Sequence, residues 1–225
     1  MNSKRERILQ RLRSAAQPHA GEGMPAIRDT DLYANHPAQE DLVERFGAKL
    51  ASLKGEFFRV REVRQAAECV KELLAPFAAA SKKICLRQPH ALIDEVIAQE
   101  AWIREHTTPL ENELSNEAFA QFEAGITTAD FLIARTGSLV LNAVTAGGRR
   151  LSVLPPLHIV IATARQAVAS LEEALAQIGN IATASYTAII TGPSRTSDIE
   201  KILVLGVHGP KRLAVIVIEN SDPNL

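Results

Sequence analysis

Apolar residues recur every three or four positions in some parts of the chain and form short unbroken runs in others. The first pattern is typical of amphipathic helices, and the second of strands buried in a sheet. Helices are predicted over residues 3–16, 39–53, 63–74, 91–97 and 165–178. Strands are predicted over residues 57–60, 83–86, 131–134, 138–142, 151–154, 158–162, 187–191 and 213–218. This alternation predicts an α/β fold with a layered, mostly parallel sheet flanked by helices, in which the all-apolar strand 213–218 is central.

The first 37 residues are predicted to form an appendage. Ile8, Leu9 and Leu12 give residues 3–16 a narrow apolar stripe, which is marginal for a helix standing alone. Prolines and glycines then punctuate a loop of about 20 residues, which is long for a compact domain. We therefore expect an N-terminal helix and extended linker over residues 1–37 and one α/β domain over residues 38–225.

Composition narrows the class of protein. Apolar residues make up 46% and charged residues 23% of the chain, as in ordinary soluble globular proteins. The net charge of −1 gives no reason to expect nucleic acid as a partner. No apolar run approaches the roughly 18 residues of a membrane span, and none follows the basic start as a signal peptide requires. A cytoplasmic location is expected.

The cysteines and histidines show no metal-binding pattern. Cys69 and Cys85 are the two cysteines of the chain, and no Cys-x-x-Cys motif is present. They are expected to be small buried hydrophobes. His90 and His106 each lack a second ligand at zinc-site spacing. No metal site is predicted, and an iron–sulfur cluster, which needs about four thiolates, cannot be held by this chain alone.

The best candidate binding site is the turn that follows the strand 187–191. Gly192 and Pro193 break the strand, and Ser197 with Glu200 resembles a capping box that starts a helix. Helix N-termini favour anions, and Arg195 adds a planar donor group suited to a carboxylate or phosphate. Asp198 is placed to hold Arg195. The alternative is a plain helix cap that binds nothing, because helix stability demands such caps in any case.

A second turn, Gly206 to Pro210, contains His208 and follows closely in sequence. His208 is the best candidate for a general base because a histidine titrates near neutrality, although it could equally bond a backbone carbonyl. The catalytic residue is otherwise unknown. The predicted ligand-binding residues are Thr136, Gly137, Thr191, Gly192, Pro193, Ser194, Arg195, Thr196, Asp198, His208 and Gly209.

Three motifs carry a family resemblance: GITTADFLIARTGSLVL at 125–141, RRLSVLPPLHIVI at 149–161, and TGPSRTSDIE at 191–200 followed by GVHGP. In this order they closely resemble the lactate-utilisation protein C family, whose shared module is the LUD domain, over residues 123–218. The resemblance implies a fold like that of ribose-5-phosphate isomerase, glucosamine-6-phosphate deaminase and the CoA-transferases. It also implies a role in oxidising L-lactate to pyruvate beside iron–sulfur partner proteins, with any cluster or flavin held by those partners.

One position departs from the family pattern. The turn that reads Arg135-Thr136-Gly137 here usually reads Glu-Thr-Gly in the family. The departure weakens any proposal of a catalytic glutamate at this point. Arg135 could make a pocket more cationic, or it could face solvent.

Three functions remain open on the sequence. The first is a cluster-free component of a lactate-oxidising system that contributes an anion pocket. The second is an autonomous enzyme acting on a phosphorylated or carboxylated substrate, with His208, Asp130 or Asp198 as its base. The third is a regulatory or structural partner. His158, at the start of a predicted strand, is expected to be a buried, bonded histidine more often than a base. The oligomeric state is not predicted.

Overall fold

The computed structural model describes residues 6, 10, 41–78, 84–110, 114–142, 149–178, 186–197, 203–205 and 209–220. Residues 39–225 form one compact unit, separate from residues 1–38. Of the first 38 residues only Glu6 and Gln10 are described, and both are helical. The rest of the predicted N-terminal helix and the predicted linker lie outside the described residues.

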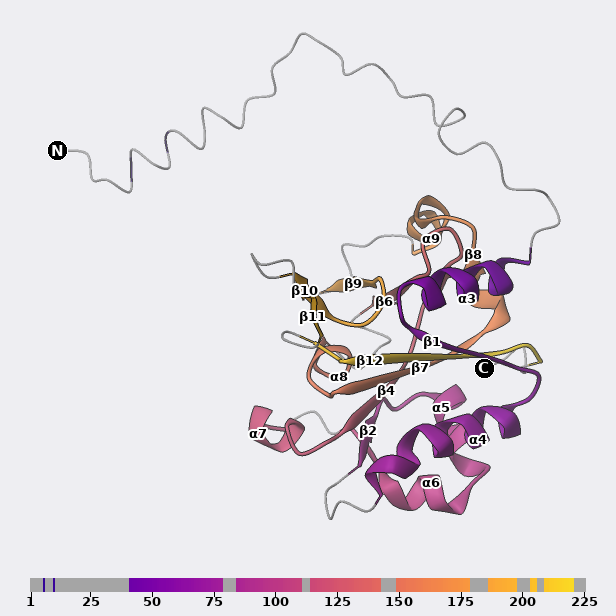
Figure 1. Cartoon of the computed structure of the whole chain (residues 1–225), viewed down its shortest axis with the longest axis vertical. Helices are drawn as coiled ribbons and strands as arrows, with labels where there is room; N and C mark the ends of the chain where they lie inside the picture. The colour runs from indigo at the N-terminus through magenta and orange to yellow at the C-terminus, as the bar shows by residue number, and fades with distance from the viewer. Residues whose placement is uncertain are drawn as a thin grey trace, which may run out of the picture. The chain divides into compact units, whose positions relative to one another are not determined.

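The longest apolar runs of the chain form strands of one sheet (Figure 1). Its 6 strands are all parallel and follow the order β1-β12-β7-β4-β2-β3. The strands are β1 (Glu56–Val60), β2 (Cys85–Arg87), β3 (Thr107–Pro109), β4 (Ala124–Thr128), β7 (Leu157–Thr163) and β12 (Arg212–Ile218). The prediction of a mostly parallel sheet is confirmed, and β12 is an inner strand between β1 and β7.

Both faces of this sheet are buried. Along β12, Val215 and Val217 contact one apolar core, while Ile216 and Ile218 contact the core on the opposite face. All four side chains have no exposed surface. This explains why β12 reads as a continuous apolar run, since successive strand residues point to opposite faces and neither face meets water.

One face carries the helices α4 (Val63–Leu74), α5 (Ala91–Ala98) and α6 (Ala101–His106) (Figure 1). The other face carries α3 (Leu42–Ser52), whose Phe46 and Leu50 are fully buried there. Asp41 caps α3 by accepting hydrogen bonds from the backbone N–H groups of Val43 and Glu44. Short elements complete the helical set: α7 (Asn116–Phe119), α8 (Arg149–Val153) and the 3₁₀ turns η1 (Ala75–Phe77) and η2 (Ala164–Gln166).

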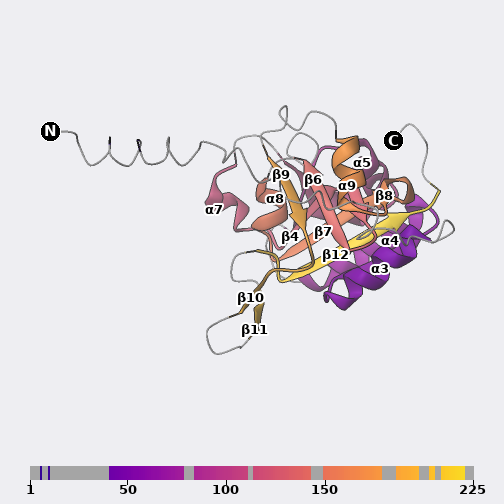
Figure 2. The same cartoon turned by 90° about the horizontal axis from the view of Figure 1, so that it is seen from above.

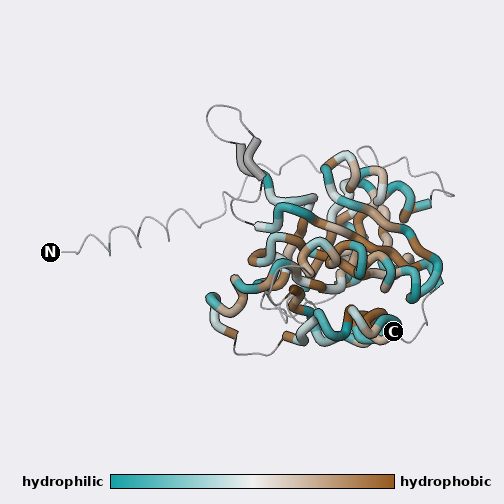
Figure 3. The backbone as a smooth tube through the Cα atoms, turned by 60° about the horizontal axis from the view of Figure 1, so that its bottom comes forward, coloured by the Kyte–Doolittle hydropathy of each residue, from teal (hydrophilic) through white to brown (hydrophobic). Residues whose placement is uncertain are grey.

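A second sheet lies beside α3 on the same face of the main sheet (Figure 2). Its 4 strands follow the order β8-β5-β6-β9 and comprise β5 (Phe131–Ile133), β6 (Ser138–Asn142), β8 (Ala167–Val168) and β9 (Thr187–Ile190). Helix α9 (Leu171–Gln177) packs against Ile133 and Val140 on its outer face. Figure 3 shows the resulting distribution, with apolar segments in the strands and polar ones on the outer turns.

Several sequence predictions need correction. Strand β10 (Arg195–Ser197) lies in the region predicted to be a turn, and it pairs antiparallel with β11 (Leu203–Leu205). The residues of the helix predicted after Ser197 lie outside the described residues. Residues 151–154 lie in or just after α8 rather than in a strand, and residues 165–178 are divided among η2, β8 and α9. Strand β9 lies at a sheet edge with Ile189 49% exposed, not buried. Strand β4 was not predicted because its Gly and Thr residues weaken the apolar pattern.

Gly137 offers a direct test of the packing between α3 and the second sheet. Its φ of +67° suits the tight turn between β5 and β6, and an added Cβ would lie 2.7 Å from the backbone nitrogen of Leu50. We expect Gly137→Ala to lower the free energy of unfolding by about 2 kcal/mol or more, through backbone strain and overpacking. Urea denaturation measures this change. Thr136→Ala, at an exposed neighbouring position, is the control and should have a much smaller effect; equal losses would contradict the interpretation.

Candidate functional site: a neutral pocket beneath strand β9

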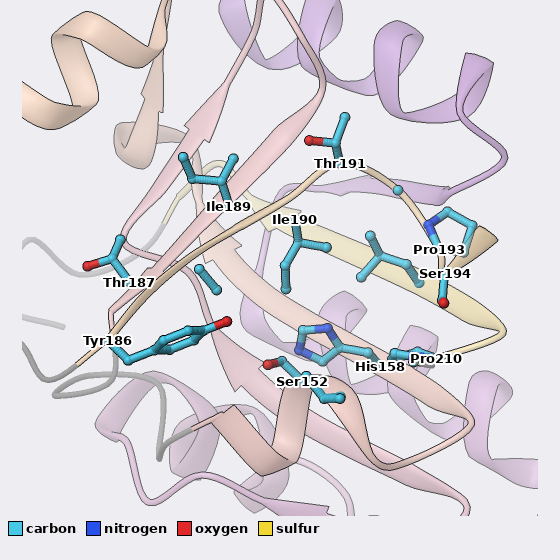
Figure 4. A pocket seen from close by; sticks show the side chains of 15 residues that line it. Ser152, His158, Tyr186, Thr187, Ile189, Ile190, Thr191, Pro193, Ser194 and Pro210 are labelled. Atoms are coloured by element: carbon cyan, nitrogen blue, oxygen red, sulfur yellow. The ribbon is translucent and has the colours of Figure 1, made fainter. Parts of the chain in front are cut away.

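A pocket of about 340 Å³ lies between β9, the turn that follows it, helix α8 and the amino ends of β7 and β12 (Figure 4). We call it the β9 pocket. Ile190 points from β9 toward the imidazole of His158, whereas Ile189 points away (Figure 4). The lining residues are Ser152, Val153, His158, Tyr186, Thr187, Ala188, Ile189, Ile190, Thr191, Gly192, Pro193, Ser194, Gly209, Pro210 and Leu213.

Two turns that are separate in sequence meet at the rim of this pocket. The backbone N–H of Ser194 donates to the carbonyl of Pro210 over 2.9 Å. A Cβ at Gly209 would lie 3.2 Å from the Cβ of Ser194, so the close contact favours glycine there. Gly192 has a φ of +89°, and an added Cβ would meet Leu53 at 3.1 Å. Gly192 therefore serves the turn and its packing on the end of α3.

His158 is the central polar side chain of the pocket. It is fully buried, and its Nε2 lies 2.8 Å from the hydroxyl of Thr127 on β4. Its Nδ1 has no hydrogen-bond partner among the described residues. Burial lowers the pKa of His158 from the ordinary 6.5 to about 3, so the imidazole is neutral at physiological pH.

Thr187 holds the other unpaired buried polar atom of this region. Within the described part of the chain its hydroxyl oxygen, too, lacks a hydrogen-bond partner. Thr187 lies on the same face of β9 as Ile189, so its side chain points away from His158 (Figure 4). Buried polar atoms in folded proteins are nearly always paired with protein, water or ligand groups. The unpaired Nδ1 of His158 therefore marks the β9 pocket as a place where a small molecule with a matching polar group gains a hydrogen bond.

The described lining is electrically neutral. Its polar groups are the hydroxyls of Ser152, Tyr186, Thr187, Thr191 and Ser194 and the imidazole of His158, and none of its side chains is an Asp, Glu, Lys or Arg. Recognition in this pocket therefore rests on hydrogen bonds and apolar contact.

The sequence-predicted site residues divide into two groups. Thr191, Gly192, Pro193, Ser194 and Gly209 line the pocket. Arg195 is exposed in β10 and is not among the lining residues, and Thr196 lies in the same strand. Asp198 and His208 lie outside the described residues.

Thr136 and Gly137 lie behind the pocket. The Ser138 hydroxyl, which is almost fully buried, lies 2.7 Å from that of Thr136 and 2.9 Å from that of Thr191. This chain of hydroxyls connects the turn before β6 to the pocket rim. Gly137 is buried against α3 and does not line the pocket.

Arg135 does not make the β9 pocket cationic. It is half-buried, is not among the lining residues, and lies near α9. The pKa of the Glu172 carboxyl on α9 is lowered by its own backbone N–H, by the Ser170 hydroxyl and, as the smallest cause, by the charge of Arg135.

A family model described as the LUD domain matches residues 43–218, which include every described lining residue of the β9 pocket. The chain belongs to the LUD domain family. The resemblance carried by the three sequence motifs is thereby confirmed.

Relatives of this LUD domain protein are found at moderate identity. An uncharacterised protein of Neisseria meningitidis serogroup B is 29% identical and covers 96% of this chain and 94% of its own. Lactate utilization protein C of Halalkalibacterium halodurans is 36% identical over 54% of this chain and 53% of its own length. The same-named protein of Geobacillus kaustophilus is 33% identical over 54% of this chain and 55% of its own. The chain thus matches about half the length of these lactate utilization proteins.

One solved structure supports the fold. The crystal structure of a DUF162 family protein from Deinococcus radiodurans matches with a TM-score of 0.58 and 18% identity, covering 79% of this chain and 96% of that chain. At this identity the similarity establishes the α/β fold alone.

The LUD domain pocket includes residues that the sequence analysis did not select. Ser152 was assigned to a strand, whereas it lies in α8. Thr187 was placed in the predicted strand 187–191 with no site role, and Tyr186, directly before that strand, was given no role. The available signal was the pair of hydroxyl residues before the otherwise apolar run of β9. His158 is buried as expected, yet the structure pairs only one of its two ring nitrogens within the described residues.

No cluster of three or more metal-ligating side chains occurs within the described ranges of the LUD domain. Cys85 is fully buried, and burial raises the pKa of its thiol; Cys69 is half-buried. Among the described helices, none has the length and apolarity needed to cross a bilayer.

The depressed pKa of His158 predicts a pH-dependent stability. Between pH 6.5 and about 3 the unfolded chain binds a proton at this imidazole that the folded chain does not. Stability should therefore fall as the pH drops through this window, by at most about 1.4 kcal/mol per pH unit from this group. Urea denaturation of wild type and His158→Gln from pH 7 to pH 4 measures the contribution. The variant should show the shallower acid slope, and parallel curves would contradict the interpretation.

Thr187→Val tests whether the unpaired hydroxyl is a stability cost. Valine keeps the shape of threonine and suits a strand, but it leaves no buried polar atom without a partner. We expect the ligand-free variant to be more stable by about 1 kcal/mol. Thr107→Val, in the distant edge strand β3, is the matched control. A loss of stability at position 187 would show that the hydroxyl has a protein partner.

Proposed function

We propose that this protein takes part in lactate utilisation and that the β9 pocket binds a small hydroxy or keto acid. The observation that carries the proposal is the unpartnered buried nitrogen His158 Nδ1, in a pocket within the LUD domain. The names of the lactate utilization protein C relatives support the process. Because the aligned stretch is about half of those proteins, their activity as whole proteins is extended here as part of the proposal.

The pocket offers suitable partners for such an acid. In the tautomer in which the Thr127 hydroxyl donates to Nε2, His158 presents Nδ1–H to an oxygen acceptor. The ligand's hydroxyl or keto oxygen suits this buried donor. Its carboxylate suits the pocket rim, where Thr191 is exposed and Ser194 is half-buried, because a carboxylate taken fully out of water without partners carries a large free-energy penalty.

The sequence prediction of an anion site is thereby revised in its chemistry. Ser197 lies in strand β10, and Arg195 is not a lining residue. Hydroxyl groups and a neutral imidazole take over the role that the prediction gave to a helix dipole and a guanidinium.

We place the redox chemistry of lactate oxidation in partner proteins. A chain with two cysteines does not meet the roughly four thiolates of an iron–sulfur cluster. Iron–sulfur partners, and any flavin that they carry, remain part of this proposal.

The geometry favours binding over autonomous acid–base catalysis. A general base works best with a pKa near the operating pH, whereas the pKa of His158 is about 3. The enzyme alternative would need a base elsewhere in the chain. The predicted likeness to the ribose-5-phosphate isomerase group belongs to that alternative.

Calorimetric titration with L-lactate and with pyruvate tests the pocket. His158→Gln should weaken binding about fivefold or more, since it removes the imidazole donor from the site. Thr107→Val should bind as the wild type does. If neither acid binds, or if His158→Gln binds with wild-type affinity, the assignment of the pocket is wrong.

Growth on L-lactate as the sole carbon source tests the process separately. We expect deletion of this protein to abolish that growth while growth on pyruvate continues, with wild type and Thr107→Val restoring it. Wild-type growth of the deletion strain on lactate would contradict the proposed process. If neither acid binds but growth on L-lactate still depends on this protein, the assignment of the pocket is wrong and the proposed process stands.

A further inference from the structure

The parallel sheet changes its direction of winding between β2 and β4. These two strands are neighbours, yet the chain leaves β2 toward the edge strand β3 and leaves β4 toward β7 on the other side. The connections therefore diverge at this point. In open α/β sheets, ligands bind in the crevice outside the carboxyl ends of the strands where such a divergence occurs.

The side chain of Gln88 holds this crevice open. Gln88 directly follows β2 and is 2% exposed. Its backbone N–H donates to Ile126 on β4 over 2.9 Å, and its side-chain oxygen accepts from the backbone N–H of Thr128 over 3.0 Å. The side-chain oxygen of Gln88 thus takes the place of the next backbone carbonyl in the hydrogen-bond ladder. The two strands separate here, and the Thr128 N–H still has a partner.

A pocket of about 370 Å³ lies at these carboxyl ends, at the opposite end of the parallel sheet from the β9 pocket. We call it the switch-point pocket. Its volume lies within the usual range for small-molecule sites, roughly 300–1,000 Å³. The lining residues are His90, Thr128, Ala129, Asp130, Phe131, Asn142, Gln166, Gln177 and Ile178.

Part of this lining is fixed structure. Gln166 accepts from the backbone N–H of Thr163 over 2.6 Å and donates to the carbonyl of Ala129, so its amide joins the strand ends and forms a wall. Asp130 Oδ2 accepts from the backbone N–H of Asn142 over 2.7 Å, which orients the carboxylate.

His90 supplies an oriented donor. Its Nδ1 accepts the backbone N–H of Leu92 over 3.2 Å, as the N-cap of α5. A nitrogen that accepts a hydrogen bond carries no proton, so the ring proton lies on Nε2. The arrangement combines a donor from His90, a carboxylate acceptor from Asp130 and the side-chain amide of Asn142, which can both donate and accept.

We propose that the switch-point pocket binds a neutral, hydroxyl-rich molecule such as a sugar or another polyol. Hydroxyl groups both donate and accept, so they match a lining that presents both kinds of partner, and Phe131 offers an apolar ring. Asp130 is the one formal charge among the lining residues that the structure describes. A carboxylate accepts hydrogen bonds and donates none, so it matches hydroxyl donors and not the carboxylate or phosphate of an acid; this pocket therefore selects a different ligand from the acid proposed for the β9 pocket.

An NMR titration of backbone amides with D-ribose tests this site. We expect ribose to shift the amide resonances of Ala129, Asp130 and Asn142 and to leave those of Thr191 and Ser194 in place. L-Lactate at the same concentrations should leave the first group unshifted. The amides that report on the switch-point pocket differ from those that report on the β9 pocket. A failure of ribose binding is therefore distinguishable from a failure of the proposed lactate site.

Two variants retain the fold contacts and remove the recognition groups. Asp130→Asn keeps an oxygen acceptor for the Asn142 N–H, and His90→Asn keeps an N-cap for α5. Each should weaken ribose binding about tenfold, through loss of a charge-assisted acceptor or of the imidazole donor. Glu72→Gln, on the exposed face of α4, is the control. Absence of ribose-dependent shifts, equal shifts with lactate, or wild-type affinity in both variants would overturn the proposal.

Discussion

The burial of β7 and β12 on both faces is the constraint on which the rest of the structure depends. Helices α4, α5 and α6 cover one face, while α3 and the second sheet cover the other. A polar side chain on such strands must find its partners inside the protein, because water cannot reach it. His158 is the polar side chain of β7 with no exposed surface, and Thr127 on the neighbouring strand satisfies one of its nitrogens. The other nitrogen opens into the β9 pocket because β9 is an edge strand that covers this end of the sheet.

The two ends of the parallel sheet consequently present different chemistry. The amino end is covered by β9 and α8, and the described lining there is uncharged. The carboxyl end lies open where β2 and β4 diverge, and Asp130 makes it acidic. Both ends belong to one hydrogen-bonded ladder of parallel strands. The two ligands that we propose therefore contact different groups of the same scaffold.

The parts of this fold with a strong apolar period were predictable from sequence. Helix α4 has the predicted bounds because one apolar stripe of it is buried, and β12 is an inner strand because its residues from Leu213 to Ile218 are buried. The predicted turn at 191–194 indeed meets Gly209 at one pocket. Strand β10 was not predicted, because its pairing with β11 further along the chain is not reported by a local capping pattern. The unpaired nitrogen of His158 was equally beyond prediction, since it depends on Thr127 from another strand.

The unpaired nitrogen of His158 also bears on whether a binding role or a redox role suits the β9 pocket under the proposed function. A 2-hydroxy acid and the corresponding 2-keto acid both carry an oxygen at the 2-position that can accept a hydrogen bond. His158 remains neutral throughout the physiological pH range because its pKa is about 3, so its Nδ1–H can serve either form. A site built in this way holds both members of such a pair and moves no proton between them. That behaviour fits a subunit that retains substrate or product for a redox partner better than it fits an autonomous oxidising enzyme.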